Sequence, residues 1–141
     1  MVRRRGSATY FADENLRGLG VLLRRAGRDD VVYPGHEELP EVPVGTSDVE
    51  WMHVVARMDM IVLTRDKHIR TRPAELAAYR ELGIRSVWLG SKRDLGPRDQ
   101  LELFLGHEER LTRWATKLGG GPWALAMSPT GVRQLRLRSE R

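Results

Sequence analysis

The sequence contains no cysteine, which excludes disulfide bonds, thiolate nucleophiles and zinc sites built on thiolates. Long apolar segments are also missing, because the longest unbroken apolar run, residues 123–127, is far shorter than a membrane span. The arginines near the start are not followed by an apolar segment, so we expect no signal peptide. These absences favour a protein of the cytoplasm with no membrane partner.

Most of the chain has no excess of positive or negative charge. The net charge is +5, and all of this excess comes from residues 1–5 and 136–141, so residues 6–135 are neutral overall. A basic composition often indicates a nucleic-acid partner, but an excess confined to the two tails supports one only weakly. The length of 141 residues suits a single domain, which we expect to have a core at about residues 8–118.

Apolar spacing predicts alternating strands and helices. Strands are expected at residues 9–12, 31–33, 60–64 and 84–89, followed by a C-terminal hairpin at about residues 123–137. Helices are expected at residues 16–26, from about residue 47, from residue 73 to Gly83, and at residues 97–118. This alternation predicts an α/β fold with a mainly parallel sheet covered by helices on both faces.

Three aspartates are predicted to meet at one edge of this sheet. Asp13 and Asp66 follow two of the strands closely, and parallel α/β sheets place functional groups at the carboxyl ends of their strands. Asp48 extends the apolar stripe of the second helix by one turn, so it is expected to face the sheet. Ser47 and Glu50 have the spacing of a helix-capping pair.

Converging carboxylates favour a divalent cation. Two unit charges about 5 Å apart repel by roughly 3 kcal/mol at an effective dielectric constant near 20, and a cation removes that repulsion. Ligands that are all oxygen suit Mg²⁺ or Mn²⁺ better than zinc. Such an ion can promote hydrolysis of a phosphodiester bond.

Each aspartate also has a purely structural interpretation. Asp13 could simply begin a turn, with Asn15 capping the helix that follows. Asp48 could be a favourable charge at a helix N-terminus, and Asp66 could be a turn residue paired with a neighbouring basic side chain. The nuclease hypothesis therefore depends on all three lying on one edge.

Three segments, in this order, resemble a known family. Residues 11–16 (FADENL), 45–50 (GTSDVE) and 61–67 (IVLTRDK) resemble the acidic segments of PIN-like domains, and the spacing is similar to that of toxin nucleases of the VapC type. The resemblance covers about residues 8–90 and implies a PIN-like three-layer fold. It implies that Asp13, Asp48 and Asp66 are the catalytic metal ligands.

The resemblance also implies properties that spacing does not reveal. Asn15 and Thr64 would be supporting polar groups, and Asp94 or Asp99 could supply the fourth acidic residue that many PIN domains have. The activity implied is that of an Mg²⁺- or Mn²⁺-dependent endoribonuclease, the toxin of a toxin–antitoxin pair. RNA would be its substrate, a cognate antitoxin its partner, and a homodimer its frequent assembly.

A basic segment next to Asp66 is the predicted RNA contact. It contains Arg65, Lys67, Arg70 and Arg72, with His68 among them. An acidic metal site repels phosphate, so a basic rim would help to admit RNA. The alternative is a solvated loop, in which case the RNA path would involve the arginines of the C-terminal segment, Arg133, Arg136 and Arg138.

Two other functions fit parts of the pattern. A receiver-like signalling domain also has an acidic pair after its first strand, here Asp13 and Glu14, but it needs a lysine at the end of a fifth strand. Neither Lys92 nor Lys117 is well placed for that role. A catalytically inactive PIN-like interaction module is the second alternative, and the complete aspartate trio argues against it.

Overall fold

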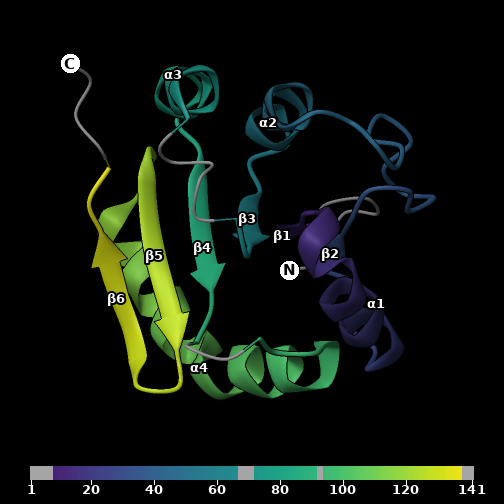
Figure 1. Ribbon diagram of the computed structural model, residues 1–141, viewed down its shortest axis with the longest axis vertical. Helices are drawn as coiled ribbons and strands as arrows, with labels where there is room; N and C mark the ends of the chain where they lie inside the picture. The colour runs from purple at the N-terminus through teal and green to yellow at the C-terminus, as the bar shows by residue number, and fades with distance from the viewer. Residues whose placement is uncertain (1–7, 67–71, 92–93, 138–141) are drawn as a thin grey trace.

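A computed structural model of the protein describes residues 8–66, 72–91 and 94–137. Six strands form one sheet in the order β2-β1-β3-β4-β5-β6 (Figure 1). The strands are β1 (Tyr10–Ala12), β2 (Val31–Val32), β3 (Ile61–Thr64), β4 (Arg85–Leu89), β5 (Trp123–Ser128) and β6 (Gly131–Leu135). Neighbouring strands from β2 to β5 pair in parallel, and β6 pairs antiparallel with β5. The predicted α/β fold with a C-terminal hairpin is confirmed.

Helices cover both faces of the sheet. They are α1 (Arg17–Arg25), α2 (Asp48–Arg57), α3 (Pro73–Leu82) and α4 (Pro97–Leu118), and a short 3-10 helix, η1 (Glu14–Leu16), precedes α1. Figure 1 shows α2 and α3 together on one side and α1 and α4 on the other. Among the described residues, no helix is both long and apolar enough to cross a membrane.

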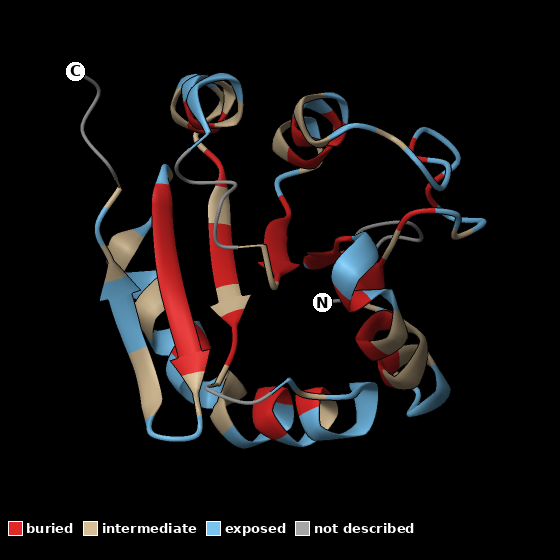
Figure 2. Cartoon of the chain, viewed as in Figure 1, coloured by how far each residue is buried: buried red, intermediate tan, exposed pale blue. Residues whose placement is uncertain are grey.

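The two faces of the sheet bury alternate residues of each strand. In β1, Tyr10 and Ala12 pack with the apolar residues of α1 and α4, whereas Phe11 packs with those of α2. Figure 2 shows the central strands buried and the outer faces of the helices exposed. Successive strand side chains point to opposite faces, so one strand contributes to two cores. Phe11 is fully buried, which stabilises the fold by roughly 1.5–3 kcal/mol.

Local sequence signals explain several helix boundaries. The Ser47 hydroxyl accepts a hydrogen bond from the Glu50 N–H (3.3 Å) and so caps α2. Pro73 occupies the first turn of α3, where a missing N–H has no cost. Gly83 ends α3 with φ +67°, a left-handed conformation that favours glycine. The helix predicted from residue 16 begins instead as η1, because the Asp13 side chain caps that 3-10 turn.

Candidate active site

Parallel pairing of β1 with β3 places Asp13 beside the end of β3. Tyr10, Phe11 and Ala12 align with Ile61, Val62 and Leu63. The register continues by one residue, because the Asp13 N–H donates to the Leu63 carbonyl (3.1 Å). Asp13 is therefore adjacent to Thr64, the last residue of β3. The strand order makes β1 and β3 neighbours, which is the condition for Asp13 and Asp66 to share one edge of the sheet.

Asp13 is a buried carboxylate, with a relative exposure of 4%. Its pKa is raised to about 7, chiefly by burial, and the negative charges of Asp48 and Asp66 contribute to this shift. Hydrogen bonds from the Thr64 hydroxyl and the Asn15 N–H act in the opposite direction. These two hydrogen bonds do not offset the effect of burial on the pKa. Among the three aspartates, Asp13 would therefore gain most from a nearby cation.

Asn15 and Thr64 connect the loops that follow β1 and β3. The Asn15 N–H donates to Asp13 Oδ1 (3.1 Å), and the Asn15 side-chain oxygen accepts from the Arg65 N–H (2.8 Å). The Thr64 hydroxyl accepts from the Asp66 N–H (2.9 Å) and bonds to the Asp13 carboxylate. Asn15 and Thr64 thus each bond to the Asp13 carboxylate and to a backbone N–H of the loop that follows β3.

Asp48 lies in the first turn of α2 and is partly buried. Its Oδ1 accepts a hydrogen bond from the Trp51 indole N–H (3.0 Å), and the Trp51 ring packs on Phe11 with ring centroids 5.0 Å apart. Burial is the main cause that raises the pKa of Asp48, and the charges of Asp66 and Glu75 add to it. The position of Asp48 therefore depends on a tryptophan fixed in the core.

Two further charged residues, Arg72 and Glu75, lie beside Asp48 and Asp66. The sequence analysis did not indicate Glu75. Arg72 Nη1 lies 3.3 Å from Asp66 Oδ2, 3.9 Å from Asp48 Oδ2 and 3.8 Å from Glu75 Oε1. The sequence signal that could have identified Glu75 is its separation from Arg72 by three residues at the start of α3, which places both on one side of the helix. The cluster of Asp48, Asp66, Arg72 and Glu75 is called the Arg72 cluster below.

The structure describes two of the four predicted RNA contacts, and both are ion-paired. Arg72 lies in its acidic cluster, and Arg65 pairs with Asp94 (3.0 Å). Lys67 and Arg70 lie outside the described residues, as does His68. Asp94, one candidate for a fourth acidic ligand, is almost fully exposed and faces Arg65, and Asp99 is exposed in the first turn of α4.

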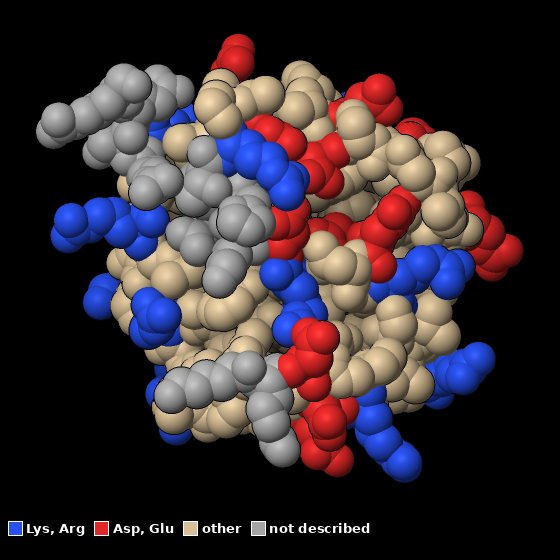
Figure 3. Space-filling model, in the orientation of Figure 1, with Lys and Arg blue, Asp and Glu red and all other residues tan. Residues whose placement is uncertain are grey.

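The oxygen-only donor set fits Mg²⁺ or Mn²⁺ in chemistry. Figure 3 shows acidic side chains around a hollow near the middle of the face in view, with basic side chains beside them. Among the residues that the structure describes, no three acidic or histidine side chains are close enough to ligate one ion directly. Mg²⁺ commonly keeps several waters and uses one or two carboxylates, so the wider arrangement suits a hydrated ion.

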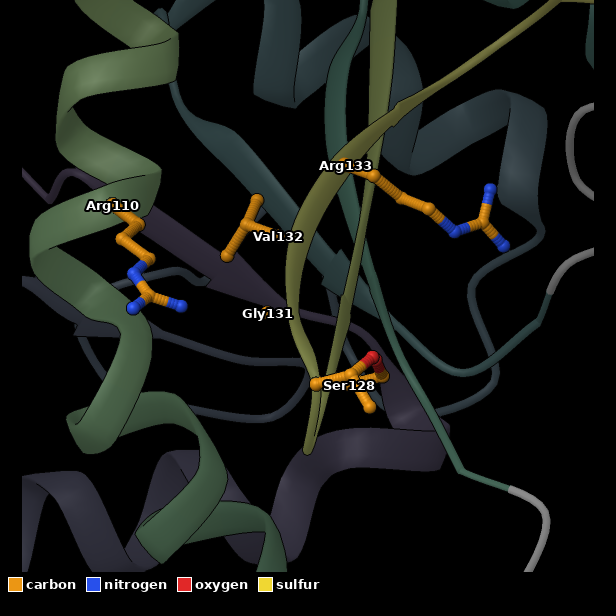
Figure 4. Close-up of a pocket in the computed structure, with 6 residues that line it drawn as sticks. Arg110, Ser128, Gly131, Val132 and Arg133 are labelled. Carbon is orange, nitrogen blue, oxygen red and sulfur yellow. The ribbon is translucent and has the colours of Figure 1, made fainter.

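A separate groove lies between α4 and the C-terminal hairpin. Its volume is about 370 Å³, and it is lined by Arg110, Ser128, Thr130, Gly131, Val132 and Arg133. Figure 4 shows Arg110 reaching from α4 toward the hairpin, whereas Arg133, on β6, points away from Arg110. None of these lining residues carries a carboxylate, and two of them are arginines.

The end of β5 bears on the receiver-like alternative. Ser128 is the last residue of β5, where a receiver would need its lysine. Lys117 lies in the last turn of α4, as predicted, and Lys92 lies outside the described residues. Within the described residues, the end of the fifth strand therefore carries a serine rather than the lysine of a receiver.

Comparison with known proteins identifies the family. The model of the PIN-like domain matches residues 8–91, which is more than half of the chain and includes Asp13, Asp48, Asp66, Arg72 and Glu75. No curated protein and no solved structure matches the chain. PIN-like domains are in general metal-dependent nucleases, whereas α4 and the C-terminal hairpin lie beyond the matched residues. The chain belongs to the PIN-like domain family.

Proposed function

We propose that this protein is an Mg²⁺- or Mn²⁺-dependent endoribonuclease, with Asp13, Asp48 and Asp66 as its catalytic metal ligands. The observation that carries the proposal is the electrostatic coupling of the three aspartates. The pKa of Asp13 is raised chiefly by burial and further by the charges of Asp48 and Asp66, and one guanidinium reaches both of those residues. A cation is the ligand that such a cluster favours.

The side chains of the site would position the ion and the substrate. When bound, a divalent ion lowers the pKa of water and neutralises charge on the phosphoryl group. Asn15 and Thr64 orient the Asp13 carboxylate, and Trp51 occupies Asp48 Oδ1 so that Oδ2 remains on the side of Arg72. Because the pKa of Asp13 is about 7, a bound cation would release a proton from it near neutral pH.

Cleavage of RNA by the purified protein is the direct test. We expect cleavage of total RNA with Mn²⁺ and none with a chelator, and we expect Asp66→Asn to be inactive under both conditions. The same incubation with DNA defines the substrate class. If the wild-type protein binds RNA but leaves it intact with Mn²⁺ and with Mg²⁺, the inactive interaction module replaces the nuclease.

We further infer that the nuclease is the toxin of a toxin–antitoxin pair. This inference extends the nuclease proposal, because an unregulated ribonuclease would damage its own cell. Expression alone should arrest growth, Asp66→Asn should relieve the arrest, and co-expression of the cognate antitoxin should also relieve it. Harmless overexpression of a folded protein that cleaves RNA would exclude the toxin role while leaving the nuclease intact. A homodimer is the expected assembly and can be checked by light scattering.

A further inference from the structure

Arg72 lies where a cation would meet the acidic residues. Its Nη1 atom is 3.3–3.9 Å from one oxygen each of Asp48, Asp66 and Glu75. These carboxylates come from three segments: the start of α2, the loop after β3 and the first turn of α3. One positive group therefore draws together side chains that are distant in the sequence.

The Asp48 carboxylate and the Asp66 backbone are each held by a residue outside this cluster. The Trp51 indole holds Asp48 Oδ1, which leaves Oδ2 toward Arg72. The Asp66 backbone N–H is bound by Thr64, and Asp66 Oδ2 lies toward Arg72. These anchors do not involve the guanidinium, so Asp48 Oδ2 and the Asp66 backbone would keep their positions for a different cation.

The contacts of Arg72 are weak enough to be exchanged. All three distances are longer than the 2.7–2.9 Å that is typical of strong charge-assisted hydrogen bonds. The Arg72 side chain is 49% exposed, and exposed ion pairs of this kind contribute about 0–1 kcal/mol. A divalent ion carries twice the charge of a guanidinium and interacts correspondingly more strongly with the same carboxylates.

We propose that Arg72 is a built-in counter-ion that competes with the divalent cation for Asp48 and Asp66 and leaves them when the ion binds. The proposal rests on the metal site of the proposed function. Glu75 lies in the first turn of α3, which Arg72 directly precedes, and its carboxylate is 3.8 Å from Arg72 Nη1, so it offers a carboxylate to the released guanidinium. Arg72 thereby sets the cation concentration at which the site becomes loaded.

Titration of the full-length protein with Mn²⁺, followed by the paramagnetic resonance signal of free Mn²⁺, tests this competition without RNA. Removing an exposed ion pair worth up to about 1 kcal/mol should tighten Mn²⁺ binding by roughly three- to fivefold in Arg72→Gln. Arg72→Lys retains the charge but loses the planar fork, so its affinity should lie between the two. The matched control is Arg113→Gln, which removes an arginine 3.3 Å from Glu109 on the surface of α4 and should leave the affinity unchanged.

The outcomes separate this proposal from the function on which it rests. Unchanged or weaker Mn²⁺ binding in Arg72→Gln, while Asp66→Asn loses binding, would overturn the competition and keep the metal site. Equal Mn²⁺ binding by wild type and Asp66→Asn would refute the metal site itself. If Arg72→Gln does not fold, Arg72→Lys decides, because an affinity no higher than that of wild type would reject the competition.

Discussion

Arg28 and Arg72 each contact at least two carboxylates, but at different distances and with different partners. The Arg28 guanidinium donates to Glu108 (2.9 and 2.6 Å) and to Asp30 Oδ2 (2.7 Å), and the Tyr10 hydroxyl donates to Glu108 as well (3.1 Å). The nearest carboxylate of Arg72 is 3.3 Å away. One arginine has forked, charge-assisted bonds, and the other has loose contacts.

The pKa shifts of the two regions differ in the same way. Hydrogen bonds to Glu108 and Asp30 raise the pKa of Arg28, so its charged form is stabilised. In the other region burial and neighbouring charges raise the pKa of Asp13 to about 7, so a negative charge is destabilised. Tight pairing indicates a structural contact that joins α4 to β1 and to the segment before β2. Loose pairing beside a destabilised carboxylate indicates a site for a ligand.

The largest expected effect is on catalysis. Asp13→Asn, Asp48→Asn and Asp66→Asn should each reduce metal-dependent RNA cleavage by more than about 100-fold, because loss of a ligand exceeds the 10- to 100-fold typical of outer-shell changes. The fold should remain intact, since each change removes one charge from a repelling group. Cleavage rates and thermal melts measure both expectations. Glu50→Gln, in the same helical turn as Asp48 and exposed, is the control.

Normal cleavage by Asp48→Asn would show that the trio is wrong. Glu14 or Glu50 would then become the candidate. The structure already gives Glu14 another contact, because its carboxylate accepts a hydrogen bond from the Gly45 N–H.

The second effect is on stability and concerns Arg28. Arg28→Met leaves Asp30 and Glu108 partly buried without their guanidinium, which should lower the free energy of unfolding by about 2–4 kcal/mol. Denaturation in urea measures the change, and cleavage per folded molecule should be unchanged. Arg113→Met, in an exposed pair with Glu109, should cost less than about 0.5 kcal/mol. Equal losses of stability in the two variants would show that the contacts of Arg28 with Asp30 and Glu108 have no special structural role.

The third effect is a dependence of stability on pH that arises from Asp13. Its folded pKa of about 7 is higher than the ordinary aspartate value of 3.8, so the folded state retains a proton that the unfolded state loses. Its contribution to stability is therefore full below about pH 4 and declines as the pH rises to about 7. Asp13→Asn should be more stable than wild type by about 1–3 kcal/mol near pH 8, with a chelator present, and equal to it near pH 4.

Chemical denaturation at the two pH values measures this difference. Asp94→Asn, whose side chain is 99% exposed, should leave stability unchanged at both. A constant difference in stability between Asp13→Asn and wild type across the pH range would contradict the retention of a proton on Asp13 in the folded state.

The fourth effect concerns Trp51 as a positioning residue. Trp51→Phe keeps an aromatic ring beside Phe11 but removes the hydrogen bond to Asp48 Oδ1. We expect Mn²⁺ affinity to fall about tenfold. Trp123→Phe is a matched control, because its indole N–H donates to a backbone carbonyl, that of Gly119 (2.9 Å), rather than to a carboxylate. If both variants bind Mn²⁺ equally, the Trp51 bond has no part in the site.

The smallest effect concerns the contact of Arg65 with RNA. In an Asp66→Asn background, Arg65→Gln should reduce the log–log slope of RNA affinity against salt by about 0.7, the value for one phosphate contact on single-stranded nucleic acid. Arg113→Gln provides the control for loss of a surface charge. An unchanged slope would favour the solvated-loop interpretation and direct attention to Arg133 and Arg136.

Much of the fold was predictable because its signals are local. The capping serine at residue 47, Pro73, Gly83 and the alternating apolar strands lie within a few residues of the boundaries that they specify. The predicted bounds of α4, residues 97–118, match the structure. The sequence could not show that an irregular 3-10 turn precedes α1, because that turn depends on where the buried Asp13 side chain is held.

The sequence by itself determined which residue types lie at the carboxyl ends of β1 and β3, and hence the choice of Asp13 and Asp66. Only the tertiary structure decided the partners of these carboxylates. Arg72 meets Asp48 because α2 and α3 cover the same face of the sheet, and Glu108 meets Arg28 because α4 packs beside α1. Electrostatic energy depends on distance in space rather than on separation along the chain, so packing alone distinguished the structural arginine from the exchangeable one.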